Sequence, residues 1–411
     1  MHPTPRPPWR RLLAALVAAA PALSCSSKSP GDGPRVIDVG RADLEVVDVG
    51  TYRVDPIGPQ SVDIEFEVDG NVLSTVVVAA PDGRGVTVFA TEFLDPSDGR
   101  LLSLDTSDVD AILPSLYASK VRAYPFLGPG PFSLLYPGSP AHALGDGAYQ
   151  VRYNVFGAEA QDVRFFTVQK KRARGAPAPA AGRLPVTLWF AENDRVDADA
   201  RDGNDPDAVA FREALAEFER IYARAGITAG PYAFRDLPPD AARRFSVVDG
   251  DEFSELFTSV DTSETPGLNF FLVESLELDS SGGVVVGLAN GIPGPPTLPH
   301  LPGGGVVVSL VALDFDPKLV GQVMAHEGGH YLGLTHTTER NGAVFDLLPD
   351  TAECDASFDL DGNEAVEAEE CVSSGATNLM FWAADQTPED VTNDQKFVLL
   401  RNPMVDTSGA E

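Results

Sequence analysis

Three histidines and one glutamate lie within eleven residues of this chain, and their spacing suits metal chemistry. On a helix, His326 and His330 present their imidazoles on one face, because residues four apart are neighbours there. Gly333 allows a sharp turn out of the helix that brings His336 back as a third ligand. Three such ligands hold Zn²⁺ and leave a fourth position open for water, as in catalytic zinc sites. The spacing therefore predicts a zinc site in which Glu327 is the general base.

Read as H-E-x-x-H-x-x-G-x-x-H, the stretch from His326 to His336 resembles the zinc signature of the metzincin metallopeptidases. Asn378-Leu379-Met380, further along the chain, is similar to the methionine turn of that superfamily. The resemblance implies that Met380 is not a ligand but forms an apolar floor beneath the three histidines.

Residues 267–400 are most similar to the pappalysin and cytophagalysin branch of the metzincins. The similar features are Thr337, the pair Asp350-Thr351, the Asn-x-Met turn and the run 391–395. The resemblance implies a sheet whose edge strand, here residues 284–289, pairs with an extended substrate. Such pairing uses backbone hydrogen bonds and tolerates many substrate sequences.

Alternation of apolar and polar residues predicts antiparallel strands in the first part of the chain. Val62–Val68 alternates strictly, and residues 149–155 repeat the pattern before a turn into residues 163–168. These segments predict a β-sandwich accessory domain over residues 36–169, with one short helix near 108–118. The domain carries no catalytic constellation, so we interpret it as a spacer, a substrate- or surface-binding module, or a pro-domain.

Strands and helices alternate over residues 184–405, which predicts an α/β unit. Asp205 is a predicted helix N-cap, and Pro317 opens the predicted helix that carries His326. Strands are predicted at 185–190, 269–273, 283–289 and 305–312. The expected fold class is therefore α+β, with an N-terminal β-sandwich followed by a metzincin-like α/β catalytic domain that holds the zinc helix and the methionine turn.

Between the two predicted domains, residues 170–183 read as a linker. Lys170, Lys171 and Arg172 begin it and form the most basic patch of the chain, and an Ala/Pro run follows. Two interpretations stay open, a solvated linker and a site of activating proteolysis.

The three cysteines suggest a division of roles. If Cys25 carries a lipid, Cys354 and Cys371 are left as a disulfide pair, and two free thiols are the alternative. The segment between them has oxygen-bearing side chains spaced almost as in an EF-hand loop. They are Asp359, Asp361, Asn363, Glu367 and Glu370. The spacing predicts a Ca²⁺ site, and the alternative is a solvated acidic loop.

Residues 1–24 read as a secretory signal, because basic residues precede an apolar run. The end of this segment resembles a bacterial lipoprotein signal, with Cys25 as the lipidated residue and 25–35 as a flexible tether. The resemblance implies a lipoprotein of the outer membrane or cell surface. Cleavage by an ordinary signal peptidase, giving a periplasmic or secreted protein, stays an alternative, and the Arg10-Arg11 pair leaves a twin-arginine route open.

The 61 acidic and 30 basic residues of the 411-residue chain give a net charge of −31. Such a surface repels nucleic acids and anionic membranes. The expected protein is a monomeric zinc endopeptidase that acts on peptide or protein substrates outside the cytoplasm. It would contact a membrane only through its lipid anchor. Two alternatives are a catalytically silent surface-binding lipoprotein and a zinc hydrolase of another substrate class.

Overall fold

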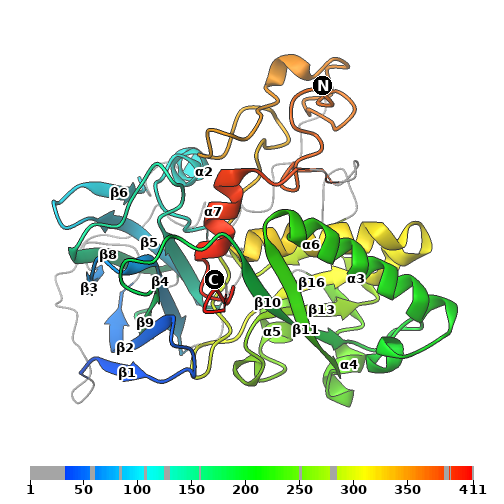
Figure 1. Cartoon of the computed structure of the whole chain (residues 1–411), viewed down its shortest axis with the longest axis horizontal. Coiled ribbons are helices and arrows are strands. Elements are labelled where there is room, and N and C mark those ends of the chain that lie inside the picture. The colour runs from blue at the N-terminus through cyan, green and yellow to red at the C-terminus, as the bar shows by residue number, and fades with distance from the viewer. Residues whose placement is uncertain are drawn as a thin grey trace.

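The computed structural model describes residues 33–409 except for 56–60, 83–85, 106–108, 125–129, 157–158, 250–251, 278–284, 384–387 and 389. The predicted signal segment and Cys25 lie outside the described residues. The structure is a mixed α+β fold, with a β-rich lobe formed by the first part of the chain and an α/β lobe beside it (Figure 1). Among the described residues, no helix is long and apolar enough to cross a membrane.

Two antiparallel sheets form the β-rich lobe. The inner sheet has the order β1-β2-β9-β4-β7 and the outer sheet has the order β3-β8-β5-β6. The inner strands are β1 (Arg35–Ile37), β2 (Leu44–Val54), β4 (Val72–Pro81), β7 (Phe132–Tyr136) and β9 (Gln161–Lys171). The outer strands are β3 (Val62–Val68), β5 (Thr87–Leu94), β6 (Arg100–Ser103) and β8 (Gly147–Phe156), and the lobe also contains helix α2 (Val109–Tyr117).

The two sheets differ in how their faces are covered. Strand β3 alternates buried and exposed side chains, as expected for a sheet with one face in solvent. Strand β4 is buried on both faces: Val77 and Ala79 pack into the core between the two sheets, whereas Val76 and Val78 pack into the core of the other lobe. The inner sheet is therefore the middle layer of the molecule.

A five-stranded sheet of order β11-β10-β13-β16-β15 forms the α/β lobe. Four of its strands are parallel, and the edge strand β15 pairs antiparallel with β16. The strands are β10 (Gly182–Phe190), β11 (Ile227–Asp236), β13 (Leu268–Val273), β15 (Gly287–Ala289) and β16 (Val306–Ser309). A second, two-stranded parallel sheet contains β12 (Val247–Asp249) and β14 (Ser275–Glu277).

Helices cover both faces of the five-stranded sheet. Helix α3 (Pro206–Arg224) begins at Asp205, whose side chain accepts the Ala208 N–H, as predicted. Helix α3 and helix α6 (Pro317–Tyr331) pack on one face, and α4 (Pro239–Arg244) and α5 (Phe253–Phe257) lie on the other. Short 3₁₀ helices are η2 (Ala198–Arg201), η3 (Thr262–Glu264), η4 (Leu310–Asp314) and η5 (Ala356–Phe358), and the last α-helix is α7 (Asn393–Arg401).

Two predicted strands of this lobe need correction. The strand predicted over 305–312 ends at Ser309, because the Ser309 hydroxyl accepts the Val311 N–H and starts η4. Of the strand predicted over 283–289, only Gly287–Ala289 is a strand among the described residues.

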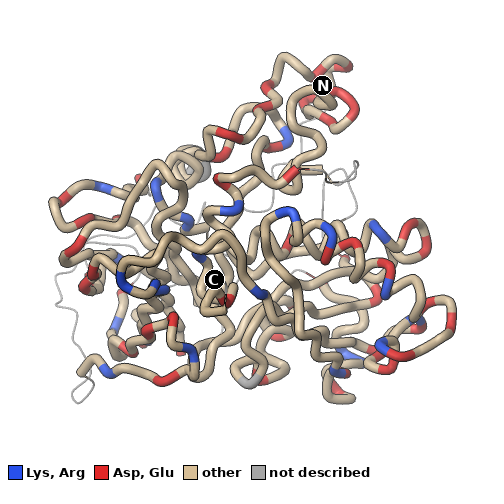
Figure 2. The backbone as a smooth tube through the Cα atoms, in the orientation of Figure 1, with Lys and Arg blue, Asp and Glu red and all other residues tan. Residues whose placement is uncertain are grey.

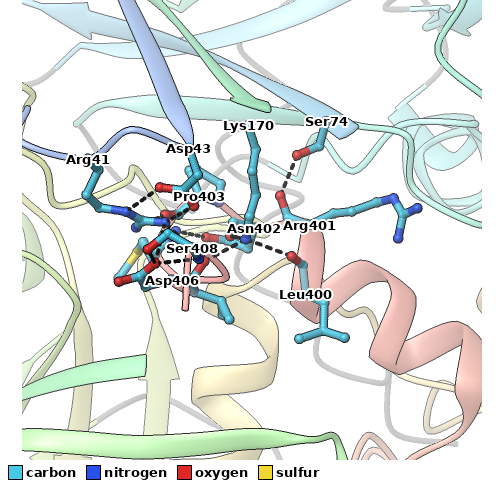
Figure 3. A network of polar contacts seen from close by, with 12 residues as sticks. Arg41, Asp43, Ser74, Lys170, Leu400, Arg401, Asn402, Pro403, Asp406 and Ser408 are labelled. Atoms are coloured by element: carbon cyan, nitrogen blue, oxygen red, sulfur yellow. Dashed lines mark hydrogen bonds and ion pairs between the residues drawn. The ribbon is translucent and has the colours of Figure 1, made fainter. Parts of the chain in front are cut away.

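The predicted linker also begins later than expected. Lys170 and Lys171 belong to β9, and Lys170 is fully buried rather than solvated. Its Nζ donates to the backbone carbonyls of Leu400, Asn402 and Val405, at 2.7, 3.1 and 2.6 Å (Figure 3). A lysine of the β-rich lobe therefore binds the C-terminal end of α7, which lies between the two lobes (Figure 1).

Acidic residues lie on the loops of both lobes (Figure 2). This distribution agrees with the net charge of −31.

Candidate metal centre

Helix α6 carries His326 and His330 on one face. The helix begins at the N-cap Asp316, with Pro317 in its first turn, and Leu332 is the C-cap. Gly333 follows with a φ of +112°, a conformation that favours glycine. The Leu334 N–H donates to the Gly329 carbonyl at 2.9 Å, which closes the helix end in the manner of a Schellman motif. The chain is then free to turn back toward the helix.

This turn brings the three histidines together. The Nε2 atom of His336 lies 3.3 Å from Nε2 of His326 and 3.1 Å from Nε2 of His330. Nitrogen ligands of a tetrahedral zinc lie about 2 Å from the metal and therefore about 3.3 Å from one another. The three imidazoles form a group that could hold one metal ion, and their spacing fits such an ion.

Backbone carbonyls orient the two helical imidazoles. Nδ1 of His326 lies 2.8 Å from the Leu379 carbonyl, and Nδ1 of His330 lies 2.7 Å from the Leu334 carbonyl. A carbonyl only accepts, so each Nδ1 carries the proton and each Nε2 presents a lone pair. This tautomer is the one that a metal bound at Nε2 requires.

Burial keeps the helical histidines neutral. It lowers the pKa of His326 to about 3, with repulsion by His336 as the next cause, and it lowers the pKa of His330 well below its ordinary value. Burial acts in the same direction on His336, but the nearby Glu339 carboxylate outweighs it and raises the pKa of His336. Neutral His326 and His330 are ready to bind a cation without first losing a proton.

Glu327 lies between the histidine group and the edge of the sheet. Burial raises its pKa to about 7, although attraction by His336 and a hydrogen bond from the Ala289 backbone oppose this rise. A Cβ atom at Gly287 would lie 2.7 Å from Cγ of Glu327, so β15 passes directly beside the carboxylate chain. A carboxylate with a pKa near 7 suits proton transfer at neutral pH.

Met380 is fully buried against helix α6. A Cβ atom at Gly329 would lie 2.6 Å from its sulfur, so this glycine makes room for the methionine. The Met380 N–H donates to the Asn378 side chain at 2.9 Å, and the Met380 carbonyl accepts the Thr337 N–H at 2.9 Å. The turn therefore holds the chain just after His336.

Sequence reasoning missed two side chains at this centre. Glu339 accepts from Nδ1 of His336 at 3.0 Å, and Tyr117 of the β-rich lobe donates its hydroxyl to the same carboxylate oxygen. Glu339 could have been noticed as a carboxylate three residues after a predicted ligand. Nothing in the sequence signals Tyr117, because it lies far away in the chain and reaches the site only through the packing of the two lobes.

The acidic loop lies near the centre but forms a separate group. Cys354 and Cys371 form a disulfide that closes the loop. Carboxylate oxygens of Asp359, Asp361 and Glu370 lie within 4.8 Å of one another and could hold a metal. The remaining two predicted ligands join the same network, since the Asn363 amide donates to Asp361 at 3.2 Å and to Glu367 at 3.1 Å.

The chain was compared with known proteins. No protein-family model and no curated protein matches it. A solved mutant of Xylanase10C from Cellvibrio japonicus, in complex with xylopentaose, is 8% identical with a TM-score of 0.18; the match covers 60% of this chain and 44% of the xylanase chain. A family two carbohydrate esterase from Cellvibrio japonicus is 12% identical with a TM-score of 0.14, covering 61% of this chain and 67% of the esterase chain. At such TM-scores these likenesses carry no argument about fold or function.

Proposed function

We propose that this protein is a zinc-dependent endopeptidase of the metzincin type. The observation that carries the proposal is the convergence of three histidine Nε2 atoms, 3.1 and 3.3 Å apart, beside a glutamate whose pKa is raised to about 7. Three nitrogen ligands favour zinc over calcium or magnesium, which prefer oxygen ligands. They also leave one position for the reaction.

A zinc ion held by His326, His330 and His336 would act as a Lewis acid that lowers the pKa of water and polarises a carbonyl oxygen. Glu327 would take the proton of the attacking water and later deliver it to the leaving amine. The position of Glu327 supports both steps, because it directly follows His326 on α6 and so lies within reach of a water bound beside the three histidines.

The substrate would lie along β15. This strand is the last of its sheet, so one side of it faces no strand among the described residues. An extended peptide could pair with that side through backbone hydrogen bonds, which is a recurring mode of peptide recognition. Because Glu327 accepts a hydrogen bond from the Ala289 backbone, a peptide bound there would lie next to the general base.

We further propose the cellular setting that the sequence predicts. The signal segment and Cys25 would place the protein on an outer membrane or cell surface as a monomeric lipoprotein. These features lie outside the described residues, so the proposal rests on the sequence alone.

The central test uses the full mature chain, zinc analysis and an unfolded protein substrate such as casein. Wild-type protein should carry about one zinc and lose activity with a chelator. Glu327→Ala should keep its zinc and lose turnover by about 10²- to 10⁴-fold, the typical contribution of a general base. Glu213→Ala, an exposed glutamate on α3, is the matched control and should cleave normally. Full turnover in Glu327→Ala, or a wild-type protein that binds no zinc, would contradict the proposal.

A further inference from the structure

His336 differs from the other two histidines in how its position is fixed. His326 and His330 belong to α6, so the helix backbone and a carbonyl contact hold each ring. His336 lies beyond the helix, in a segment without regular structure. Its Nδ1 contacts a side chain, the Glu339 carboxylate, rather than the main chain. The orientation of the third imidazole therefore depends on what holds Glu339.

The β-rich lobe supplies that support. Tyr117, the last residue of α2, is almost fully buried, and its hydroxyl donates to Oε1 of Glu339. The same Oε1 accepts from Nδ1 of His336 at 3.0 Å. A continuous chain of hydrogen bonds thus runs from the β-rich lobe to the third histidine.

Tyr124 links Tyr117 to a second part of the α/β lobe. Tyr124 exchanges backbone hydrogen bonds with Ile292, at 2.8 and 3.1 Å, in the segment that follows β15. The Tyr124 ring packs edge-on against the Tyr117 ring, with centroids 5.9 Å apart. The β-rich lobe also approaches the C-terminal end of α6, because a Cβ atom at Gly333 would lie 2.9 Å from Leu135 of β7.

We propose that the β-rich lobe is part of the metal centre, and that Tyr117 is a positioning residue that acts through Glu339 on His336. The inference rests on the proposed zinc function and assigns a role to a lobe that carries no ligand of its own. The Tyr117 hydroxyl holds the Glu339 carboxylate in one orientation. The carboxylate in turn keeps the His336 proton on Nδ1 and directs Nε2 toward the other two histidines. Partners of this kind orient metal ligands and strengthen metal binding.

The test measures zinc affinity by competition with a chromophoric chelator, on the full mature chain. Tyr117→Phe keeps the ring packing and removes only the hydroxyl, and it should weaken zinc binding by about 10- to 100-fold. Glu339→Gln should weaken it in the same way. The double variant should bind zinc no more weakly than Glu339→Gln alone, because two residues that act in one chain do not contribute additively. Cobalt-loaded Tyr117→Phe should also show an altered visible spectrum, since one ligand is reoriented.

Tyr136→Phe is the matched control. Its hydroxyl donates to the Ala143 carbonyl at 3.2 Å inside the β-rich lobe, so the variant loses one hydroxyl contact away from the centre. It should bind zinc as wild type does. If Tyr117→Phe melts at a lower temperature but keeps wild-type zinc affinity and cobalt spectrum, Tyr117 is only a packing residue and the inference is overturned. A wild-type protein that binds zinc but cleaves no peptide would overturn the proposed function and leave the affinity result on Tyr117 standing.

Discussion

Asp346 is a buried acid with one satisfied and one unsatisfied oxygen. Oδ1 accepts the Thr351 hydroxyl at 2.6 Å, whereas Oδ2 has no hydrogen-bond partner within the described part of the chain. The buried guanidinium of Arg122 also makes no hydrogen bond to a described residue, although it attracts Asp346. Burial is the largest influence and raises the pKa of Asp346 to about 7.

This pKa has a measurable consequence for stability. Between about pH 4 and pH 7 the folded protein keeps a proton on Asp346 that the unfolded chain has released. The free energy of unfolding should therefore fall as the pH rises through this window. Asp346→Asn cannot ionise, so it should lack this contribution and gain on wild type by up to about 1.4 kcal/mol per pH unit. Urea unfolding of both proteins from pH 4 to pH 8 measures the difference, and parallel curves would show that Asp346 does not titrate in this range.

At this scale the sequence predicted the residues whose roles follow from local spacing. His326, Glu327 and His330 lie on one helix, and Gly333 determines where His336 returns, so four positions follow from one short pattern. The role of Tyr117, in contrast, depends on its hydrogen bond to Glu339, which joins the two lobes. Hydrogen bonding across such distances in the chain leaves no periodicity that a sequence could display.

The acidic loop is an element whose backbone resembles the predicted calcium loop. Counted from Asp359, the sixth position is Glu364, which has a φ of +65° where an EF-hand loop has glycine. Asp359 accepts three backbone N–H groups, from Gly362, Asn363 and Glu364. These contacts draw the loop into a tight turn around its acidic side chains, whose mutual repulsion a cation would relieve.

Calcium should therefore stabilise the wild-type protein. At a concentration 100-fold above its Kd, one bound ion contributes about 2.7 kcal/mol to the free energy of unfolding. The double variant Asp359→Ala, Asp361→Ala should lose this stabilisation, whereas the control Glu353→Ala, Glu369→Ala should retain it. Thermal unfolding with increasing calcium decides between a calcium site and a solvated loop, and equal curves for wild type and the first variant would favour the loop.

Strands with one exposed face can be located from the sequence, whereas strands buried on both faces are harder to locate. Strand β3 alternates strictly and was assigned from the sequence alone. Strand β4 is a nearly continuous run of buried residues, which carries no period and no hint of two separate cores. Strand β15 has only three residues, and its place at the sheet edge was inferred from the family resemblance rather than from its own pattern.

A group of hydrogen bonds centred on Lys170 joins the two lobes of the molecule. The Lys170 Nζ donates to the backbone carbonyl of Leu400 in the last turn of α7 and to those of Asn402 and Val405, which follow the helix (Figure 3). Arg41 donates to the Pro403 carbonyl at 2.5 Å, and Ser74 donates to the Arg401 carbonyl at 2.5 Å. Burial lowers the pKa of Lys170 to about 7, and an ammonium group supplies one proton to each of its three acceptors.

Replacing Lys170 should weaken the whole fold. Lys170→Met keeps the aliphatic chain but leaves three buried carbonyls without their donor, and this should reduce the free energy of unfolding by about 3 kcal/mol. Lys171→Met is the matched control. That neighbouring side chain forms partly exposed ion pairs with Glu45 and Asp69, which contribute little. Chemical denaturation at pH 6 gives the free energy of unfolding of both variants. An equal loss in the two would contradict the role of Lys170 in joining the lobes.

The two lobes share part of one core, which the predicted domain boundaries do not show. Val76, Val78 and Phe166 of the inner sheet share one core with α3, α6 and α7. The sequence shows a change from strands to alternating strands and helices, which marks a change of architecture. It does not show what covers the second face of the inner sheet, because a continuous apolar run indicates a buried strand without identifying the elements that pack against it.

The shared core also bears on how the protein is made. A ribosome delivers the β-rich lobe first, and the core that Val76, Val78 and Phe166 share with α3, α6 and α7 is complete only when α7 has emerged. The histidines are already present by then, but Leu379 and Met380, which hold His326 and the segment after His336, come only shortly before α7. A nascent chain would thus carry all three histidines of the candidate centre before that centre has formed. Under the proposed function, the ability to cut peptides would therefore arise late in synthesis, only once the C-terminal segment has been added.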